Sequence, residues 1–272
     1  MSDIRIIIAT TKKYRMPEDE VYLPLHVGAA LRGKGDLDYT TDATGDNISD
    51  KNASYCELTG LYWAWKNLDC DVLGMVHYRR YFASPDRERL KNAQTPFDRI
   101  LTGREVSSLM KRYSLILPTK RHYVIETLQS HYAHTHYEEQ LLSTRVIIER
   151  MYPEYLACFD HVMKKTSGHM FNMLIARRDI LGRYCSWLFP ILEELEDFMS
   201  VEELSSYQER YIGRIAELIF NVWLEYELEK KTIKRSDILE LPVVYAERVD
   251  WIKKGRAFLL AKFFHKKYEK SF

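Results

Sequence analysis

The densest group of side chains suited to binding an anion is the string His77-Tyr78-Arg79-Arg80-Tyr81, which directly follows the apolar run 72–76. Two adjacent guanidinium groups offer forked donors that match phosphate oxygens without a metal. Neighbouring tyrosines can pack on a ring or on the face of a sugar. The alternative is an interior aromatic cluster whose arginines pair with some of the 39 acidic residues. We favour phosphate binding, because a strand that ends here would deliver both cations to the ligand-binding edge of a sheet.

Two Asp-x-Asp pairs match the pattern with which metal-dependent sugar-nucleotide transferases hold a cation on a diphosphate. Asp36-Leu37-Asp38 lies in a long polar loop, and Asp69-Cys70-Asp71 precedes an apolar run. The second pair would stand at the amino end of its strand, whereas ligands in open α/β sheets bind at the carboxyl ends. We therefore assign no metal ligand, and we leave open a divalent Mn²⁺ or Mg²⁺ ion.

Several other polar residues lie in hydrophobic surroundings. Four histidines occur within fifteen residues: His122, His131, His134 and His136. Only His131 and His134 would share a face of one helix, so histidines on a helix surface are a simpler interpretation than a metal site. His169 precedes an apolar run and Glu217 lies within a hydrophobic helical stretch, and both are candidates for an acceptor site.

The spacing of apolar residues predicts the elements that must position these groups. Short apolar runs, β-branched in the first case, predict buried strands over 4–10, 72–76, 114–117, 170–175 and 241–245. Helical spacing predicts helices over 54–68, most of 124–165, 178–197 and 205–230, with a capping box at Ser54–Glu57 and Pro153 at a helix start. Residues 32–53 are predicted to form a long loop. Strands that alternate with helices indicate an α/β fold with a mainly parallel central sheet, flanking helices and a helical C-terminal part.

Composition narrows the class of protein. The chain has 272 residues, with 40 Lys and Arg against 39 Asp and Glu, and this balance does not favour a nucleic-acid binder. Its four cysteines form no Cys-x-x-Cys pair, which favours a reducing cytoplasm. The N-terminus lacks the features of a signal peptide, and no apolar run approaches the roughly 20 residues that span a bilayer. Residues 251–272 are basic and amphipathic, and we expect them to attach the protein to the surface of an anionic membrane rather than only to pack on the domain.

The longest motifs, ELTGLYWAWKN and HYRRY, resemble a bacterial family that was long described as a domain of unknown function. The resemblance extends over segments 10–17, 45–49, 55–67, 77–82, 171–173 and 217–224, and so over most of the chain up to about residue 245. Members of this family occur in capsule, exopolysaccharide and O-antigen loci. The resemblance implies a glycosyltransferase with a variant of the GT-A fold, and some relatives are similar to galactofuranosyltransferases that use UDP-galactofuranose.

The resemblance also suggests a role for each motif. Ala9 and Thr10 would lie near the uracil or ribose, and Asp46 and Asn47 would shape the donor pocket. The remaining donor contacts would be Thr11, Lys12, Tyr14, Tyr55 and Tyr78. His77, Arg79 and Arg80 would take the place of the metal and stabilise the departing diphosphate. The general base would be Glu57, His131, His169 or Glu217, and of these we favour His169.

The expected activity is transfer of a hexosyl unit, galactofuranosyl or galactosyl, from a UDP-sugar to a hydroxyl of a growing, lipid-linked surface glycan, with inversion. Residues 1–245 would form the catalytic domain, and 246–272 would form a basic amphipathic tail for membrane attachment. The protein would work at the cytoplasmic face of the inner membrane, and a homo-oligomer is left open. The main alternative is a non-catalytic sugar-binding or scaffold component of a polysaccharide assembly complex. A metal-dependent hydrolase built on the histidines is a third interpretation.

Overall fold

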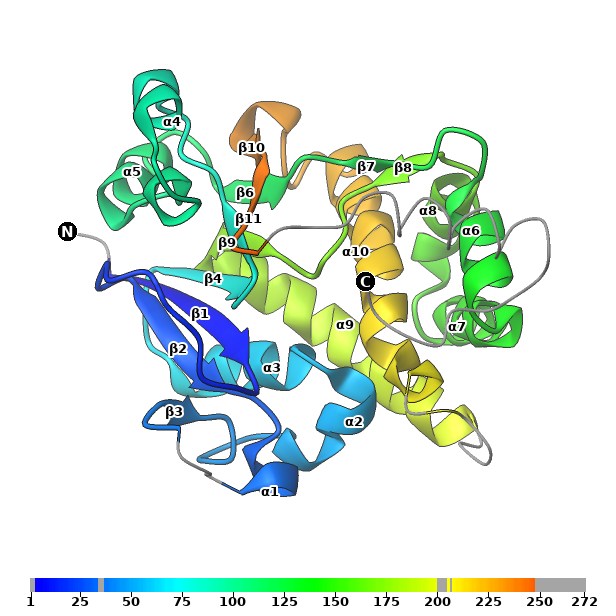
Figure 1. Cartoon of the computed structure of the whole chain (residues 1–272). Coiled ribbons are helices and arrows are strands. Elements are labelled where there is room, and N and C mark those ends of the chain that lie inside the picture. The colour runs from blue at the N-terminus through cyan, green and yellow to red at the C-terminus, as the bar shows by residue number, and fades with distance from the viewer. Residues whose placement is uncertain (1–2, 34–36, 200–204, 206, 248–272) are drawn as a thin grey trace. The chain divides into compact units, whose positions relative to one another are not determined.

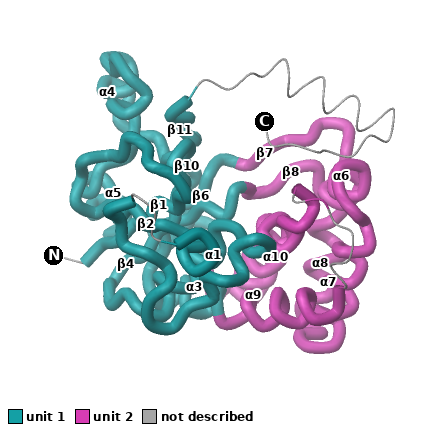
Figure 2. The backbone as a smooth tube through the Cα atoms, turned by 60° about the horizontal axis from the view of Figure 1, so that its bottom comes forward, with its two compact units in different colours: residues 1–119, 171–185, 234–247 teal, residues 120–170, 186–233, 248–272 magenta. Residues whose placement is uncertain are grey.

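The computed structural model describes residues 3–33, 37–199, 205 and 207–247. The chain divides into two compact units, coloured teal and magenta in Figure 2. The first comprises Met1–Thr119, Phe171–Cys185 and Lys234–Glu247, and the second comprises Lys120–Met170, Ser186–Ile233 and Arg248–Phe272. The basic segment 251–272 lies outside the described residues, so its expected membrane role stays a prediction.

A nine-stranded sheet forms the centre of the first unit (Figure 1). Its main path runs in the order β10-β6-β9-β4-β1-β2-β3. The strands of this path are β1 (Ile4–Thr10), β2 (Tyr22–His26), β3 (Thr40–Thr41), β4 (Val72–His77), β6 (Leu115–Pro118), β9 (Leu174–Arg177) and β10 (Ile238–Leu241). Neighbours are parallel except at β9, which is antiparallel to both β4 and β6. The predicted α/β class with a mainly parallel central sheet is therefore confirmed.

Helices cover the sheet because its central strands β1 and β4 carry apolar side chains on both faces. In this unit they are α1 (Ala29–Arg32), α2 (Asn52–Tyr55), α3 (Leu58–Asn67), α4 (Arg87–Asn92) and α5 (Gly103–Leu109), with 3₁₀ turns η1 (Ser49–Lys51), η2 (Phe97–Arg99) and η5 (Arg235–Asp237). Helix α3 packs on one face so closely that a Cβ on Gly60 would lie 2.8 Å from Val27 Cγ1. On the other face Ile6, Ile8 and Val106 of α5 share one buried core. The alternation of side chains along β1 thus supplies apolar contacts to both layers.

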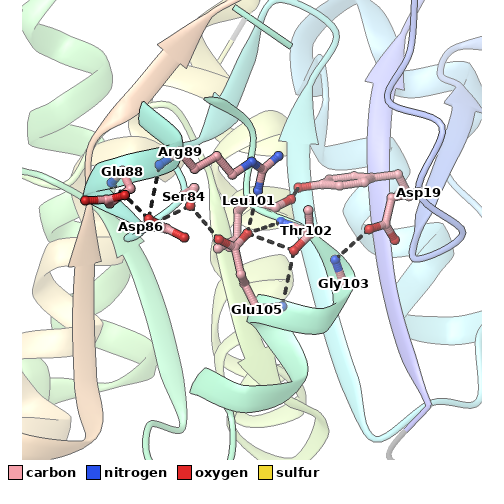
Figure 3. Close-up of polar contacts among 10 residues, drawn as sticks. Asp19, Ser84, Asp86, Glu88, Arg89, Leu101, Thr102, Gly103 and Glu105 are labelled. Carbon is pink, nitrogen blue, oxygen red and sulfur yellow. Dashed lines mark hydrogen bonds and ion pairs between the residues drawn. The ribbon is translucent and has the colours of Figure 1, made fainter. Parts of the chain in front are cut away.

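Glu105 anchors α4 and α5 to this face of the sheet (Figure 3). Its carboxylate accepts hydrogen bonds from Ser84 Oγ at 2.5 Å, from Arg89 at 2.9 Å and from the Thr102 backbone N–H at 2.7 Å. Thr102 also caps the Glu105 backbone N–H, which completes a capping box. Burial alone would raise the pKa of Glu105, but these hydrogen bonds hold it below its ordinary value. All of these contacts are used to fix the helices, so we assign Glu105 a structural role.

Three predicted elements have different bounds in the structure. The predicted helix 54–68 is broken at Cys56, whose φ of 54° separates α2 from α3, and the Ser54 hydroxyl donates to the Lys51 carbonyl instead of closing a capping box. The predicted strand 170–175 begins only at Leu174, because two residues before it adopt positive φ. The predicted strand 241–245 is divided at Pro242 into β10 and β11 (Val243–Tyr245). Strand β2 was not predicted; it contains Pro24, a residue type that is uncommon inside strands.

The second unit is mostly helical, as predicted for 124–165 and 205–230. It contains α6 (Leu128–Thr135), α7 (Glu138–Met151), α8 (Leu156–Met163) and α10 (Tyr211–Glu229), the 3₁₀ turns η3 (Pro153–Tyr155) and η4 (Gln208–Arg210), and the short pair β7 (Arg121–His122) and β8 (Ser167–Gly168). Helix α9 (Arg178–Phe198) begins in the first unit and continues into the second. Tyr155 and Tyr226 stack at 3.8 Å and join η3 to α10. None of the described helices combines the length and apolar composition needed to cross a membrane.

Candidate active site

A two-residue turn carries the cationic motif to the carboxyl end of β4. His77 ends β4 and is the Cα partner of Arg80, the first residue of β5 (Arg80–Phe82), so that Tyr78 and Arg79 form the turn between them. The same His77 is the Cα partner of Ala9 in the parallel strand β1. The motif therefore lies beside the carboxyl end of β1, at the edge where open α/β sheets bind ligands.

His77 and Arg80 both contact Phe171. His77 Nε2 lies 2.5 Å from the Phe171 carbonyl oxygen, and the guanidinium carbon of Arg80 lies 4.8 Å from the centre of the Phe171 ring. Arg80 Nε is buried and has no hydrogen-bond partner among the described residues. A buried donor of this kind is uncommon in native proteins and needs a physical explanation. We interpret it as a donor held ready for a ligand.

Phe171 and Asn172 form a strained turn that brings a carboxylate to the same place. Their φ angles are 79° and 50°, a left-handed conformation that costs a non-glycine residue about 1–3 kcal/mol. Asn172 Nδ2 donates to Glu57 Oε1 at 2.7 Å. Glu57 is the residue that precedes α3, so its carboxylate stands at the amino end of that helix. The turn thus contacts Glu57 before α3 and His77 and Arg80 of the β4–β5 hairpin, which are two separate segments of the chain.

The two adjacent arginines engage different partners. Arg79 lies over the Tyr78 ring at 5.0 Å and forms a loose ion pair with Glu247 at 3.7 Å. Tyr78 stacks on Tyr14 with a centroid distance of 4.1 Å, and its burial raises the pKa of the Tyr78 phenol. Arg80 therefore lies over the Phe171 ring, while Arg79 lies over Tyr78, which stacks on Tyr14.

The side chain of Thr10 orders the loop that follows β1. Thr10 is 1% exposed, and its hydroxyl donates to the Lys12 carbonyl at 2.7 Å and accepts from the Lys12 N–H at 3.2 Å. This ties the buried residues Ala9 and Thr10 to the turn, whereas Thr11 is half-buried and Lys12 is exposed. The predicted donor contacts at 9–12 and 14 thus lie at the carboxyl end of β1 and in the loop that follows it.

His26 belongs to the same edge and was not predicted. It is the Cα partner of Thr10 on one side and of Thr41 on the other, so that these three side chains form a row across β1, β2 and β3. His26 is 2% exposed, and neither ring nitrogen has a hydrogen-bond partner among the described residues. Burial lowers the pKa of His26 below its ordinary value. Because strand β2 was not predicted, its last residue, His26, was not predicted as a site residue either.

Asp42 organises the loop that sequence analysis left without structure. It is 0% exposed and accepts hydrogen bonds from the backbone N–H groups of Gly28 at 2.8 Å and Ala29 at 3.1 Å. The hydroxyls of Ser49 at 2.5 Å and Thr59 at 2.6 Å complete its set of donors. Because Thr59 lies in the first turn of α3, Asp42 fixes the end of that helix at which Glu57 stands.

Three predicted donor contacts lie in other surroundings. Asp46 binds the C-terminal half of α3, where it accepts from Tyr62 Oη at 3.0 Å and pairs with Lys66 at 3.7 Å. Asn47 closes a local turn by donating to the Gly45 carbonyl at 2.9 Å. Tyr55 is 2% exposed beneath the Lys51 ammonium. The Asp46 N–H also donates to the Asn67 side chain at 3.1 Å, and Asn67 is the last residue of α3. From there the chain continues to the amino end of β4, whereas His77 and Arg80 lie at its carboxyl end, so the structure does not bring Asp46 to them.

His169 and Glu217 lie in the second unit and share one partner. The Asn221 amide accepts from the His169 N–H at 2.7 Å, and its Nδ2 donates to the carbonyls of His169 and Glu217, each at 2.9 Å. His169 is 4% exposed, with its ring edge-on to Phe220 at 6.5 Å. This arrangement fixes the backbone of His169 against α10.

The two Asp-x-Asp pairs and the histidine group are the places where the sequence could hold a divalent cation. The described residues contain no group of three or more His, Cys, Asp or Glu side chains placed to hold a metal. Asp71 accepts from the Asp3 N–H at the amino end of β4, and Asp36 lies outside the described residues. His131 and His134 both bond to the buried Glu126, each through Nδ1 at 2.8 Å. We therefore derive no step through a metal ion.

Comparisons with known proteins agree with this architecture. Residues 5–230 match the model of a family described as a domain of unknown function, DUF4422. A solved structure, the apo form of the bifunctional glycosyltransferase WbbM, superposes with a TM-score of 0.79 at 28% sequence identity. The match covers 90% of this chain and 46% of that one, so the chain spans about half the length of WbbM. A search of curated proteins finds no significant match.

Proposed function

The chain belongs to the DUF4422 family, and we propose that it is a glycosyltransferase that moves a hexosyl unit from a UDP-sugar to a hydroxyl of a surface glycan. The bifunctional glycosyltransferase that shares its fold supports the class of reaction. The observation that carries the proposal is the group of Glu57, His77 and Arg80 around the strained Phe171–Asn172 turn. An acid can serve as the general base of a glycosyl transfer, and a histidine and a guanidinium donor can stabilise the leaving diphosphate.

In this proposal Arg80 and His77 bind the diphosphate. The acceptor oxygen forms a bond to the anomeric carbon, the bond from that carbon to the diphosphate oxygen breaks, and its electron pair leaves on UDP. The negative charge that develops there is stabilised by the Arg80 guanidinium, whose Nε has no partner among the described residues. The guanidinium should stabilise this charge more strongly at a half-buried position than at the surface, because water screens the interaction less there.

Glu57 takes the proton of the acceptor hydroxyl in this scheme. Sequence analysis favoured His169 as the base, but Glu57 is the candidate that the structure joins to His77 and Arg80 through consecutive residues. The hydrogen bond from Asn172 orients its carboxylate. A base separate from the leaving diphosphate fits a single displacement, and we therefore propose inversion at the anomeric carbon.

The nucleotide would occupy the adjacent part of the edge. The 10–14 loop, the Tyr14–Tyr78 stack and Arg79 line the other side of the β4–β5 turn, and a ring face and a cation there suit a base and a phosphate. We further propose a galactofuranosyl or galactosyl donor and a lipid-linked acceptor at the inner face of the cell membrane. These assignments rest on the resemblance carried by the ELTGLYWAWKN and HYRRY motifs.

The test is Arg80→Gln in the purified chain, measured by UDP release from UDP-hexoses with a glycan acceptor and by UDP binding. We expect kcat/KM to fall about 10²–10³-fold, the loss found when one preorganised donor to a developing negative charge is removed. Arg112→Gln is the matched control, because that exposed guanidinium also lies over a tyrosine ring, at 5.2 Å from Tyr113. If both variants kept full activity and UDP affinity, the role of Arg80 would be wrong. If no UDP-hexose were turned over or bound by the unaltered chain, the donor class would be wrong.

A further inference from the structure

The loop between β7 and α6 presents two adjacent apolar side chains to solvent. Val124 is 82% exposed and Ile125 is 59% exposed. The Ile125 N–H donates to the Tyr123 carbonyl at 2.6 Å, which closes a γ-turn centred on Val124 at a φ of 55°. This form of the γ-turn is rare and strained, and a β-branched residue is among the least suited to it. Among the described residues, Val124 is thus the most exposed large apolar side chain, and it is held in an unfavourable conformation.

The base of this loop is firmly held. The Tyr123 N–H donates to the Thr166 carbonyl at 2.8 Å, and the Tyr123 ring packs on His131 at 4.2 Å. Glu126, which is 5% exposed, bonds to His131 and His134. The two histidines that sequence analysis considered as metal ligands therefore secure the loop. An ordered base means that Val124 and Ile125 are presented at a defined place in the unit.

Cationic residues flank this apolar tip along the chain. Lys120 and Arg121 precede it, and Arg121 lies 5.0 Å from the Tyr123 ring. Lys164 is exposed two residues before Thr166, the partner of Tyr123. The acidic side chain of the loop itself, Glu126, is turned to the two histidines. A small apolar tip flanked by cationic residues is complementary to a surface that is anionic at the headgroups and apolar beneath them.

We propose that segment 120–126 is an interfacial anchor: Val124 and Ile125 enter the headgroup–acyl boundary of an anionic bilayer while Lys120, Arg121 and Lys164 contact lipid phosphates. Two side chains bury far less than the roughly 1,000 Å² that a specific protein interface requires, whereas membrane binding adds small apolar insertions to charge attraction. This surface is distinct from segment 251–272. It also makes no use of the transfer reaction, so a failure of the donor assay leaves it unaffected.

The experiment uses the full chain and vesicles of phosphatidylcholine, either alone or mixed with phosphatidylglycerol. In Val124→Asn with Ile125→Ser, we expect partitioning onto the mixed vesicles to fall about tenfold or more, because both apolar insertions are lost. Asparagine tolerates the left-handed region, so thermal stability should stay equal or rise, and lost binding cannot then be assigned to unfolding. Lys120→Gln with Arg121→Gln should weaken binding to the mixed vesicles and leave binding to pure phosphatidylcholine unchanged.

The matched control is Leu142→Ser with Val146→Ser, which removes two exposed apolar side chains from α7 of the same unit, 47% and 55% exposed. This variant should bind vesicles as the unaltered chain does. Equal partitioning of the Val124/Ile125 variant and this control would overturn the proposal. Self-association of the chain that the Val124/Ile125 substitutions abolish, with no vesicle binding, would overturn it in favour of a contact between copies.

Discussion

Replacing Asp42 with asparagine tests whether the buried carboxylate holds the amino end of α3 in place. Each Asp42 oxygen accepts from one backbone N–H and one hydroxyl: Oδ1 from Ala29 and Ser49, and Oδ2 from Gly28 and Thr59. An asparagine must turn its NH₂ group toward one of these pairs. The hydroxyl of that pair can rotate and accept, but the backbone N–H cannot, so one buried donor loses its partner.

The magnitude follows from this count. An unsatisfied buried N–H costs about 1–3 kcal/mol, and the loss of charge assistance in the remaining bonds adds roughly 1–2 kcal/mol. We therefore expect Asp42→Asn to lower the free energy of unfolding by about 2–5 kcal/mol. Because the midpoint of urea denaturation shifts by this energy divided by a slope of about 1–3 kcal/mol/M, it should fall by roughly 1 M or more.

Asp46→Asn is the matched control, because it makes the same substitution at an exposed carboxylate that binds Tyr62 and Lys66. Surface pairs of this kind contribute about 0–1 kcal/mol, so its urea midpoint should change little. Both variants are followed by circular dichroism in urea, alongside UDP binding. If Asp42→Asn were as stable as Asp46→Asn, the reasoning that Asp42 organises the loop would be refuted.

Two further outcomes follow from buried groups. Burial lowers the pKa of His26 and of His131 below the ordinary value of 6.5, so as the pH falls these histidines bind protons in the unfolded chain before they do in the folded chain. The free energy of unfolding should therefore fall as the pH drops from about 7 to 5, and urea midpoints that are independent of pH would contradict this prediction. Asn221→Ala leaves the backbone N–H and carbonyl of His169 without their side-chain partner, and the expected loss of about 2–4 kcal/mol is measured by thermal denaturation. A melting temperature equal to that of the unaltered chain would contradict the second prediction.

Local patterns were enough to predict the strands that carry the site. β1 was predicted with its observed bounds, Ile4–Thr10, and β4 was predicted to within one residue, because continuous apolar runs indicate buried parallel strands. The place of the cationic motif at the end of β4 followed from the order of residues alone. The different partners of Arg79 and Arg80 did not, since they depend on Phe171 and Glu247, which are distant in the chain.

Conformations imposed by distant contacts escaped prediction. Cys56, Phe171 and Asn172 have positive φ although none is glycine, so no residue type marked the break before α3 or the turn before β9. In the sequence, nothing distinguishes Asp42 from the other acidic residues of the polar loop 32–53. Its role depends on donors that lie 7 to 17 residues away in the chain and come together only when α1 and α3 have packed on the sheet.

By itself, the sequence determined which residues could bind phosphate, which runs would be buried strands, and that these strands would form a mainly parallel sheet. Only the tertiary structure decided which chemical groups meet. His77 reaches Phe171 across 94 residues, and Asn172 reaches Glu57 across 115. Strand and helix preferences act over a few neighbouring residues, whereas a hydrogen bond between such distant side chains depends on the packing of the whole sheet. For this reason the choice of Glu57 over His169 as the proposed base required the structure.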